Sequence, residues 1–173
     1  NVSPKAKLCL PVFMACALLA AALFTGGCSD DAAEPPFPTQ PIPDPNNWLF
    51  TVFGSGPNDV YAAGARGAMF HYDGNDTNGW APINIGTSQA ITRLWGAGDG
   101  TIFAVGHGGT ILRNSGDDWR NWSGMSSGVT KDLYGIGRFR GDIFACGFEG
   151  TLRRLSGSNW NGLPGLSWIL DEN

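Results

Sequence analysis

One segment of the chain occurs three times, and this repeat limits the possible folds more than any other feature. The copies read DVYAAGARGAMFHYDG, TIFAVGHGGTILRNSG and DIFACGFEGTLRRLSG, and they begin at Asp59, Thr101 and Asp142. Two glycine columns run through all three copies: Gly64, Gly106 and Gly147, then Gly67, Gly109 and Gly150. A fixed period of about 41 residues indicates a chain built from repeated supersecondary units.

Each copy is preceded by an aromatic-glycine pair and followed by a tryptophan. The pairs are Phe53-Gly54, Trp95-Gly96 and Tyr134-Gly135, and the tryptophans are Trp80, Trp119 and Trp160. Each unit thus holds four short apolar runs, rich in β-branched and aromatic residues and without helical periodicity, which predicts strands. A four-stranded antiparallel unit of about 41 residues has the size of a β-propeller blade. The sequence therefore predicts an all-β fold of three blades, over about 48–90, 91–130 and 131–173.

Three blades are too few to close a ring, since propellers use about four to eight. We expect residues 48–173 to be part of a larger propeller, in keeping with a first residue, Asn1, that is not methionine. The alternative is assembly through the open faces of the terminal blades. In either arrangement, the second run of each copy, such as IFAVG, is apolar on both faces and is expected to lie between neighbouring blades.

The repeat resembles the propeller repeats of bacterial surface lipoproteins, which are loosely similar to the Asp-box repeats of sialidases and to those of photosystem II assembly factors. The resemblance rests on the VFG, LWG and LYG starts, the DVYAAG core, and the hairpin HYDGNDTNGW with Asp73, Gly74 and Trp80. It implies three possible functions: a non-catalytic module that binds a protein or glycan, a sialidase-like glycoside hydrolase, or an assembly factor for a membrane complex. We expect the first, because no convergent catalytic set is visible and no cofactor is implied.

The N-terminal segment, residues 1–27, predicts export. Lys5 and Lys7 precede an apolar run from Leu8 to Phe24, the order of a secretory signal. The following TGGCS resembles the lipobox of bacterial lipoproteins, which implies cleavage before Cys28 and its acylation, with Ser29 favouring the outer membrane. Ordinary secretion to the periplasm or beyond, and a transmembrane helix, are the alternatives.

Residues 28–47 form a proline-rich spacer after the proposed anchor. They hold six of the eleven prolines, so we expect an extended stalk of roughly 60 Å. Without Lys5 and Lys7, nine basic residues face fifteen acidic ones, and such a balance argues against a nucleic-acid partner. The expected partners are the membrane and a protein or glycan.

Four features resemble ligand sites. GHGG at 106–109 resembles a phosphate loop, but the glycine columns and the strand pattern after it favour a turn. His107 does not repeat and lies at a turn tip. With His71 as the one other histidine, we expect an exposed and unengaged side chain, and His107 is the first residue at which to look for a ligand contact. DGNDTNG at 73–79 departs from a calcium loop, and no metal site is expected. Cys146, in an apolar column, is expected to be buried, and tryptophans 48, 80, 95, 119 and 160 are expected to pack between blades.

Overall fold

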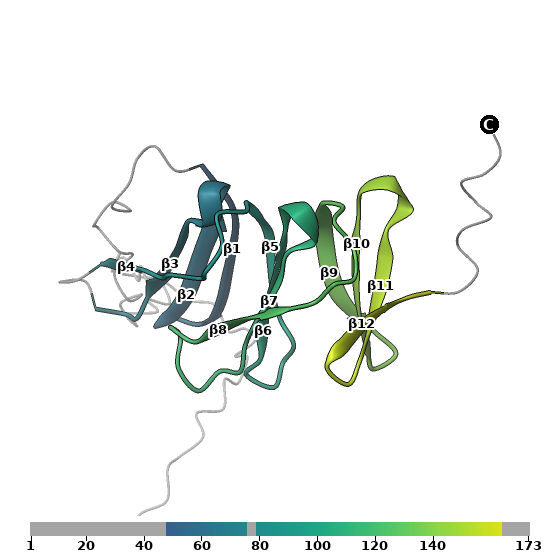
Figure 1. Cartoon of the computed structure of the whole chain (residues 1–173). Coiled ribbons are helices and arrows are strands. Elements are labelled where there is room, and N and C mark those ends of the chain that lie inside the picture. Colours follow the sequence, from purple (N-terminus) through teal and green to yellow (C-terminus); the bar gives the residue numbers. More distant parts are fainter. Residues whose placement is uncertain (1–47, 76–78, 164–173) are drawn as a thin grey trace, which may run out of the picture. The chain divides into compact units, whose positions relative to one another are not determined.

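The computed structural model describes residues 48–75 and 79–163, and these form three antiparallel sheets of four consecutive strands each (Figure 1). The predicted all-β blade architecture is confirmed. Cys28, the N-terminal segment and the spacer lie outside the described residues. In the described part of the chain, no helix has the length and apolar character needed to cross a membrane.

Each blade is a meander in which sequential strands pair. The first blade comprises β1 (Leu49–Gly56), β2 (Asp59–Gly64), β3 (Met69–Tyr72) and β4 (Trp80–Pro82). The second comprises β5 (Ile91–Gly96), β6 (Ile102–Gly106), β7 (Ile111–Asn114) and β8 (Trp122–Met125). The third comprises β9 (Leu133–Phe139), β10 (Asp142–Gly147), β11 (Leu152–Ser156) and β12 (Asn159–Gly162).

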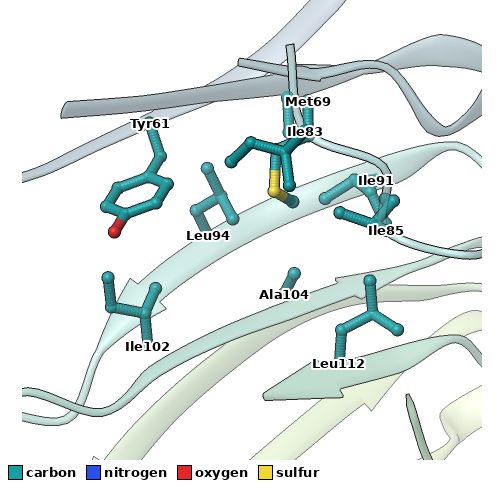
Figure 2. Packing of buried hydrophobic residues seen from close by; sticks show 10 residues of the cluster. Tyr61, Met69, Ile83, Ile85, Ile91, Leu94, Ile102, Ala104 and Leu112 are labelled. Carbon is teal, nitrogen blue, oxygen red and sulfur yellow. The ribbon is translucent and has the colours of Figure 1, made fainter. Parts of the chain in front are cut away.

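Two apolar clusters hold neighbouring blades together, one at each blade junction. Strand β1 contacts β5, and β5 contacts β9, so the first strands of successive blades are neighbours. Strand β6 is buried along its whole length because it packs on both sides, as expected. The first cluster, shown in Figure 2, joins side chains of the first blade and its outgoing loop to the near face of the second: Tyr61, Met69, Ile83, Ile85, Ile91, Leu94, Ile102, Ala104 and Leu112.

The first glycine column lets the start of each blade approach the second strand closely. A Cβ atom on Gly106 would lie 2.1 Å from the carbonyl oxygen of Ala90. The same oxygen accepts a hydrogen bond from the His107 backbone N–H at 2.9 Å. The equivalent bonds, Ala65 N to Trp48 O and Phe148 N to Asp132 O, measure 2.7 and 2.8 Å. One backbone contact is therefore repeated in every blade, and only glycine leaves room for it.

The second glycine column closes a short 3₁₀ turn between the second and third strands. Gly109 has φ of +72°, and a Cβ there would lie 2.0 Å from the carbonyl oxygen of Val129 in the loop to the next blade. The turn His107–Gly109 leads directly into strand β7 rather than into a helix. The predicted turn between the second and third strands is therefore confirmed.

The third aromatic-glycine pair is not equivalent to the first two, which corrects the alignment from sequence. Phe53 pairs with Tyr61 and Trp95 with Phe103, but Phe144 pairs with Gly137. Gly137 therefore occupies the column of Phe53 and Trp95 in the third blade, and Tyr134 lies three residues before it.

The column of Gly96 shows why the pattern changes in the third blade. A Cβ atom on Gly96 would lie 2.3 Å from the ring of Phe53, so glycine there makes room for the aromatic side chain of the preceding blade. Arg138 occupies this column in the third blade, and its guanidinium carbon lies 6.0 Å from the ring centre of Trp95. A cation-π contact thus replaces glycine-aromatic packing at the second junction.

Two further expectations are wrong. Cys146 is exposed rather than buried, because the face of the third blade on which it lies has no described blade packed against it. Trp48 is 73% exposed at the start of β1 and packs between no described blades. Trp80 belongs to neither junction cluster, and its ring centre lies 5.8 Å from that of Tyr72 in its own blade. The other three predicted tryptophans do line the junctions, Trp119 at the first and Trp95 and Trp160 at the second, and Trp122 joins Trp119 at the first.

Candidate functional site

A cleft of about 610 Å³ lies between the first and second blades, at the end where the β1–β2 and β5–β6 hairpins turn. The first blade contributes Ser55, Asp59 and Tyr61 to its walls. The second contributes strand β6 and the loop between β7 and β8: Gly100, Ile102, Gly116, Asp117, Asp118, Trp119 and Arg120. The cleft therefore belongs to the junction and not to either blade alone.

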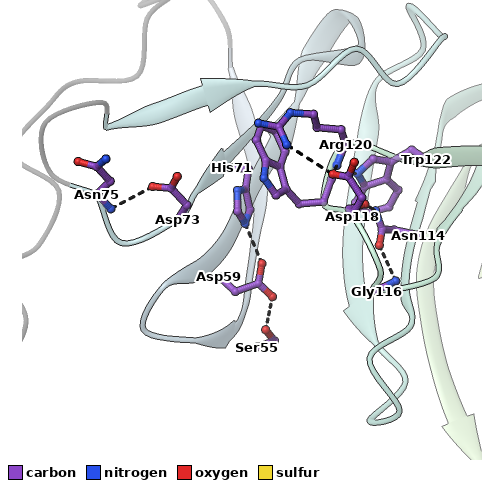
Figure 3. Close-up of polar contacts among 11 residues, drawn as sticks. Ser55, Asp59, His71, Asp73, Asn75, Asn114, Gly116, Asp118, Arg120 and Trp122 are labelled. Carbon is purple, nitrogen blue, oxygen red and sulfur yellow. Dashed lines mark hydrogen bonds and ion pairs between the residues drawn. The ribbon is translucent and has the colours of Figure 1, made fainter.

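Stacked rings from both blades form one wall of this cleft. His71, on β3, is 3% exposed and has its ring centre 4.6 Å from both Tyr61 and Trp119. The His71 and Trp119 rings are nearly parallel, at 20°. The Arg120 guanidinium carbon also lies 3.8 Å from the centre of the Trp119 ring, in cation-π geometry. A dashed line in Figure 3 marks the ion pair between Arg120 and Asp118.

Hydrogen bonds fix the ionisation state of Asp59. Its Oδ1 accepts a hydrogen bond from His71 Nε2 at 2.7 Å, and Ser55 Oγ donates to its other oxygen. Burial raises the pKa of Asp59, but the hydrogen bonds from Ser55, His71 and Tyr61 outweigh it, so the pKa lies below its usual value. Asp59 is consequently a carboxylate at neutral pH.

The pKa of Tyr61 is shifted in the opposite direction, upward. Burial, followed by the charge and hydrogen bond of the Asp59 carboxylate, raises the pKa of its phenol well above the usual value. Because the phenol stays protonated at neutral pH, Tyr61 serves as a hydrogen-bond donor to Asp59. The His71 Nδ1 atom is buried without a hydrogen-bond partner among the described residues.

The Asp59–His71 pair is a blade element and not an isolated dyad. Asp142 and Arg154 hold the same two columns in the third blade and form an ion pair at 3.0 Å. In the second blade the same columns hold Thr101 and Arg113. The Asp59–His71 pair differs from the others because a residue of the next blade covers it. Trp119, in the β7–β8 loop of the second blade, stacks on the His71 ring.

Asn114 shapes the β7–β8 loop, which carries Trp119. It is fully buried, and its Nδ2 donates hydrogen bonds to the carbonyl oxygens of Asp118 and Asn121 at 2.8 and 3.1 Å. Its Oδ1 accepts a hydrogen bond from the Gly116 N–H at 2.7 Å. The loop therefore runs to residue 121 before β8 begins at Trp122, three residues later than the tryptophan column predicts.

The charges of the cleft favour a cation. Asp59, Asp117 and Asp118 supply three carboxylates, whereas Arg120 is the one cationic side chain among the residues lining it. Arg120 lies 3.6 Å from Asp118, and both side chains are substantially exposed. Carboxylates beside an aromatic wall are the groups that bind guanidinium and ammonium side chains.

No metal site emerges from the described residues: across 48–75 and 79–163, no three His, Cys, Asp or Glu side chains gather suitably. The calcium-like loop lies partly outside that range. Its described part forms an Asx turn, in which the Asn75 N–H donates to Asp73 Oδ1 at 3.0 Å.

His107 lies at the 3₁₀-turn end of the blades and does not line the hairpin-end cleft. Its Nδ1 is 4.0 Å from Asp132 Oδ2, and its ring meets Tyr134 edge-on at 6.3 Å. Asp132 also accepts a hydrogen bond from the Gly108 N–H at 2.8 Å. His107 therefore has neighbours, contrary to the expectation of an unengaged side chain, and its role as a ligand contact stays a prediction.

Sequence reasoning missed His71 and Asn114, the two buried polar residues on which the cleft depends. A signal for His71 was present, since its column holds arginine in the other two copies, at Arg113 and Arg154. Asn114 gives no such signal, because its column holds Tyr72 and Leu155 in the other blades. Its role depends on the length of the loop that follows it.

Comparison with known proteins supports the fold and not a family. Neither a family model nor a curated protein sequence matches the chain. One similar solved structure is YCF48 from Cyanidioschyzon merolae, with 21% identity and a TM-score of 0.53 over 71% of this chain and 38% of that one. Another is YCF48 bound to D1 peptide, with 18% identity and a TM-score of 0.53 over 71% of this chain and 42% of that one. The chain thus spans less than half the length of these β-propellers.

Proposed function

We propose that the chain is a non-catalytic interaction module that binds a protein segment, with a basic side chain of that segment in the cleft between the first two blades. The observation that carries the proposal is the pairing of an aromatic wall with three carboxylates in one solvent-open cleft of about 610 Å³. Support for a peptide ligand comes from the structure of YCF48 bound to D1 peptide, because YCF48 is a protein of similar fold that binds a peptide.

The cleft suggests how the basic side chain is held. The Arg120 guanidinium already stacks on Trp119 and pairs with Asp118, which shows the geometry that a cation adopts here. Arg120 has an exposed side chain, so a ligand guanidinium displaces it at small cost and gains charge-assisted hydrogen bonds to Asp117 and Asp118. Asp59 is less available, because Ser55 and His71 already use its oxygens.

The described site gives no support to the sialidase-like alternative. A carboxylate, Asp59, does lie beside Tyr61, but sialidase-like chemistry also needs an arginine cluster for the substrate carboxylate, and Arg120 is the one arginine that lines the cleft. Glu149, the one glutamate in the described part of the chain, pairs with Lys131 at the 3₁₀-turn end. An assembly factor for a membrane complex would use the same kind of peptide contact. The identity of the bound partner distinguishes that narrower role from a general interaction module.

Calorimetric titration of the full chain with a short arginine-containing peptide tests this function. We expect saturable binding that weakens about tenfold when the peptide arginine becomes glutamine, and by a similar factor in the D117N/D118N double variant. The matched control is D142N, which removes the carboxylate of the equivalent pair in the third blade and should leave affinity unchanged. Equal affinity for the arginine and glutamine peptides would contradict the proposal.

We also propose that the module is held outside the cytoplasm, at the bacterial outer membrane, by acylation of Cys28 and the proline-rich spacer. The support is the sequence pattern at 1–47. Replacing Cys28 with serine should move the protein from the membrane fraction to the soluble fraction, while the control C16S, within the signal, should stay membrane-bound. Membrane retention of C28S would contradict the lipid anchor.

A further inference from the structure

A second cleft lies between the second and third blades, and it is the counterpart of the cleft between the first two. Four columns of the repeat line both clefts: Asp59 and Thr101, Tyr61 and Phe103, Ile102 and Ile143, and Gly116 and Gly157. The second cleft has a volume of about 190 Å³, and Ala97, Met125 and Leu155 add apolar surface to its walls. The chain thus forms the same kind of cleft at two successive blade junctions.

The second cleft differs from the first in the charged group that the repeat places beside it. Arg113 lines it from β7, in the column where the first blade has His71 and the third has Arg154. In those two blades an aspartate at the start of the second strand pairs with the basic residue, at 2.7 Å for His71 and 3.0 Å for Arg154. The second blade has Thr101 in place of that aspartate, so it keeps the cation and omits the counter-charge.

The exposed Arg113 side chain has no ion-pair or hydrogen-bond partner among residues 48–75 and 79–163. Asp99 is the one carboxylate that lines the second cleft, and its Oδ1 accepts a hydrogen bond from the Thr101 N–H at 3.0 Å. Hydrogen bonds from Thr101, with the charge of Arg138 acting in the same direction, hold the pKa of Asp99 below its usual value.

Asp99 is therefore engaged by Thr101 and does not pair with Arg113. The guanidinium of arginine presents its N–H donors in a planar fork that matches the two oxygens of a carboxylate. Arg113, with this fork unused and apolar side chains around it, is suited to bind a carboxylate that enters the second cleft.

We propose that the second cleft binds a carboxylate of the same protein segment whose basic side chain occupies the first cleft. This inference rests on the proposed function and deepens it, because it specifies a ligand with two opposite charges. Facing sheets pack about 10 Å apart and an extended chain advances about 3.3 Å per residue, so the two charges are expected about three residues apart. The carboxylate belongs to an acidic side chain or to the C-terminus of the segment.

Calorimetric titration of the full chain in detergent with four C-terminally amidated peptides tests the inference. The peptides carry arginine or glutamine at one position and glutamate or glutamine three residues away, in two series that place the glutamate before or after the arginine. In one series, we expect the peptide with arginine and glutamate to bind about fivefold more tightly than the peptide with arginine and glutamine. A further peptide, with a free C-terminal carboxylate in place of the glutamate, distinguishes the two sources of the carboxylate by which of them binds more tightly.

Substitutions in one column of the repeat assign the preference to Arg113. R113Q should abolish the preference for a carboxylate with unchanged circular dichroism, because the side chain is exposed. The matched control is R154Q, which removes the equivalent guanidinium of the third blade, already paired with Asp142, and should keep the preference.

Two results would overturn the inference: equal affinity of the wild-type protein for peptides with and without the carboxylate, or a preference that survives in R113Q. The same peptides report separately on the proposed function. Loss of the arginine preference alone would contradict the basic side chain in the first cleft and leave the contact of Arg113 with a carboxylate standing. Absence of binding by every peptide would overturn both.

Discussion

Replacing Gly106 with alanine is expected to destabilise the protein by about 3 kcal/mol, the cost of forcing a methyl group against backbone that cannot move freely. The new Cβ atom would lie 2.1 Å from the Ala90 carbonyl oxygen, at which strand β5 begins its approach to β6. Relief of this overlap separates the two strands and breaks the hydrogen bond from the His107 N–H to Ala90. Chemical denaturation followed by tryptophan fluorescence measures the effect.

Gly124→Ala is the matched control, because it changes a glycine on β8 of the same blade. No atom lies within 4 Å of a Cβ at that position, so the substitution should change stability by less than about 0.5 kcal/mol. If both variants were equally stable, the first glycine column would not be the spacing element that the fold requires.

Replacing Asn114 with alanine is the second large effect that we expect, about 3 kcal/mol of stability together with loss of peptide binding. The substitution removes the partner of the Asp118 and Asn121 carbonyls and of the Gly116 N–H, and it leaves a gap where the fully buried Asn114 side chain stood. The loop that carries Trp119 then loses its shape. Denaturation measures the first effect, and titration with the arginine peptide at a temperature where the variant is folded measures the second.

Asn84→Ala provides the comparison for this prediction. Asn84 also accepts a hydrogen bond from the backbone N–H two residues later, at 3.0 Å, but it does so on an exposed loop. Its replacement should cost less than about 1 kcal/mol and leave binding intact. Retention of wild-type affinity in the folded N114A protein would show that the loop does not form the binding site.

Much of the fold follows from the sequence because the blade-forming contacts are repeated along the chain. Gly106 and Gly109 could be recognised as architectural without coordinates, since the same glycines recur where their neighbours differ. The buried second strand could be recognised as well, because a strand covered on both faces is apolar throughout. These features recur in each copy, which makes them visible in the sequence.

What could not be predicted depends on loop length, on strand register and on contacts between blades. Trp119 was assigned to the start of a strand, but it lies in the preceding loop, where it stacks on His71 of the first blade. Tyr134 was assigned to the aromatic column, because the register of β9 with β10 cannot be read from the spacing alone. Cys146 shares its column with buried residues, yet its burial depends on a neighbour that the column does not specify.

The most direct test of the account is to map the bound arginine peptide on the ¹⁵N-labelled full chain by nuclear magnetic resonance. The cleft predicts the largest shift changes at the Trp119 indole N–H and at the amides of Gly116, Asp117 and Arg120, saturating with one affinity. Changes centred instead on His107 and Tyr134, at the opposite end of the blades, would contradict the assignment of the binding site to the junction between the first two blades.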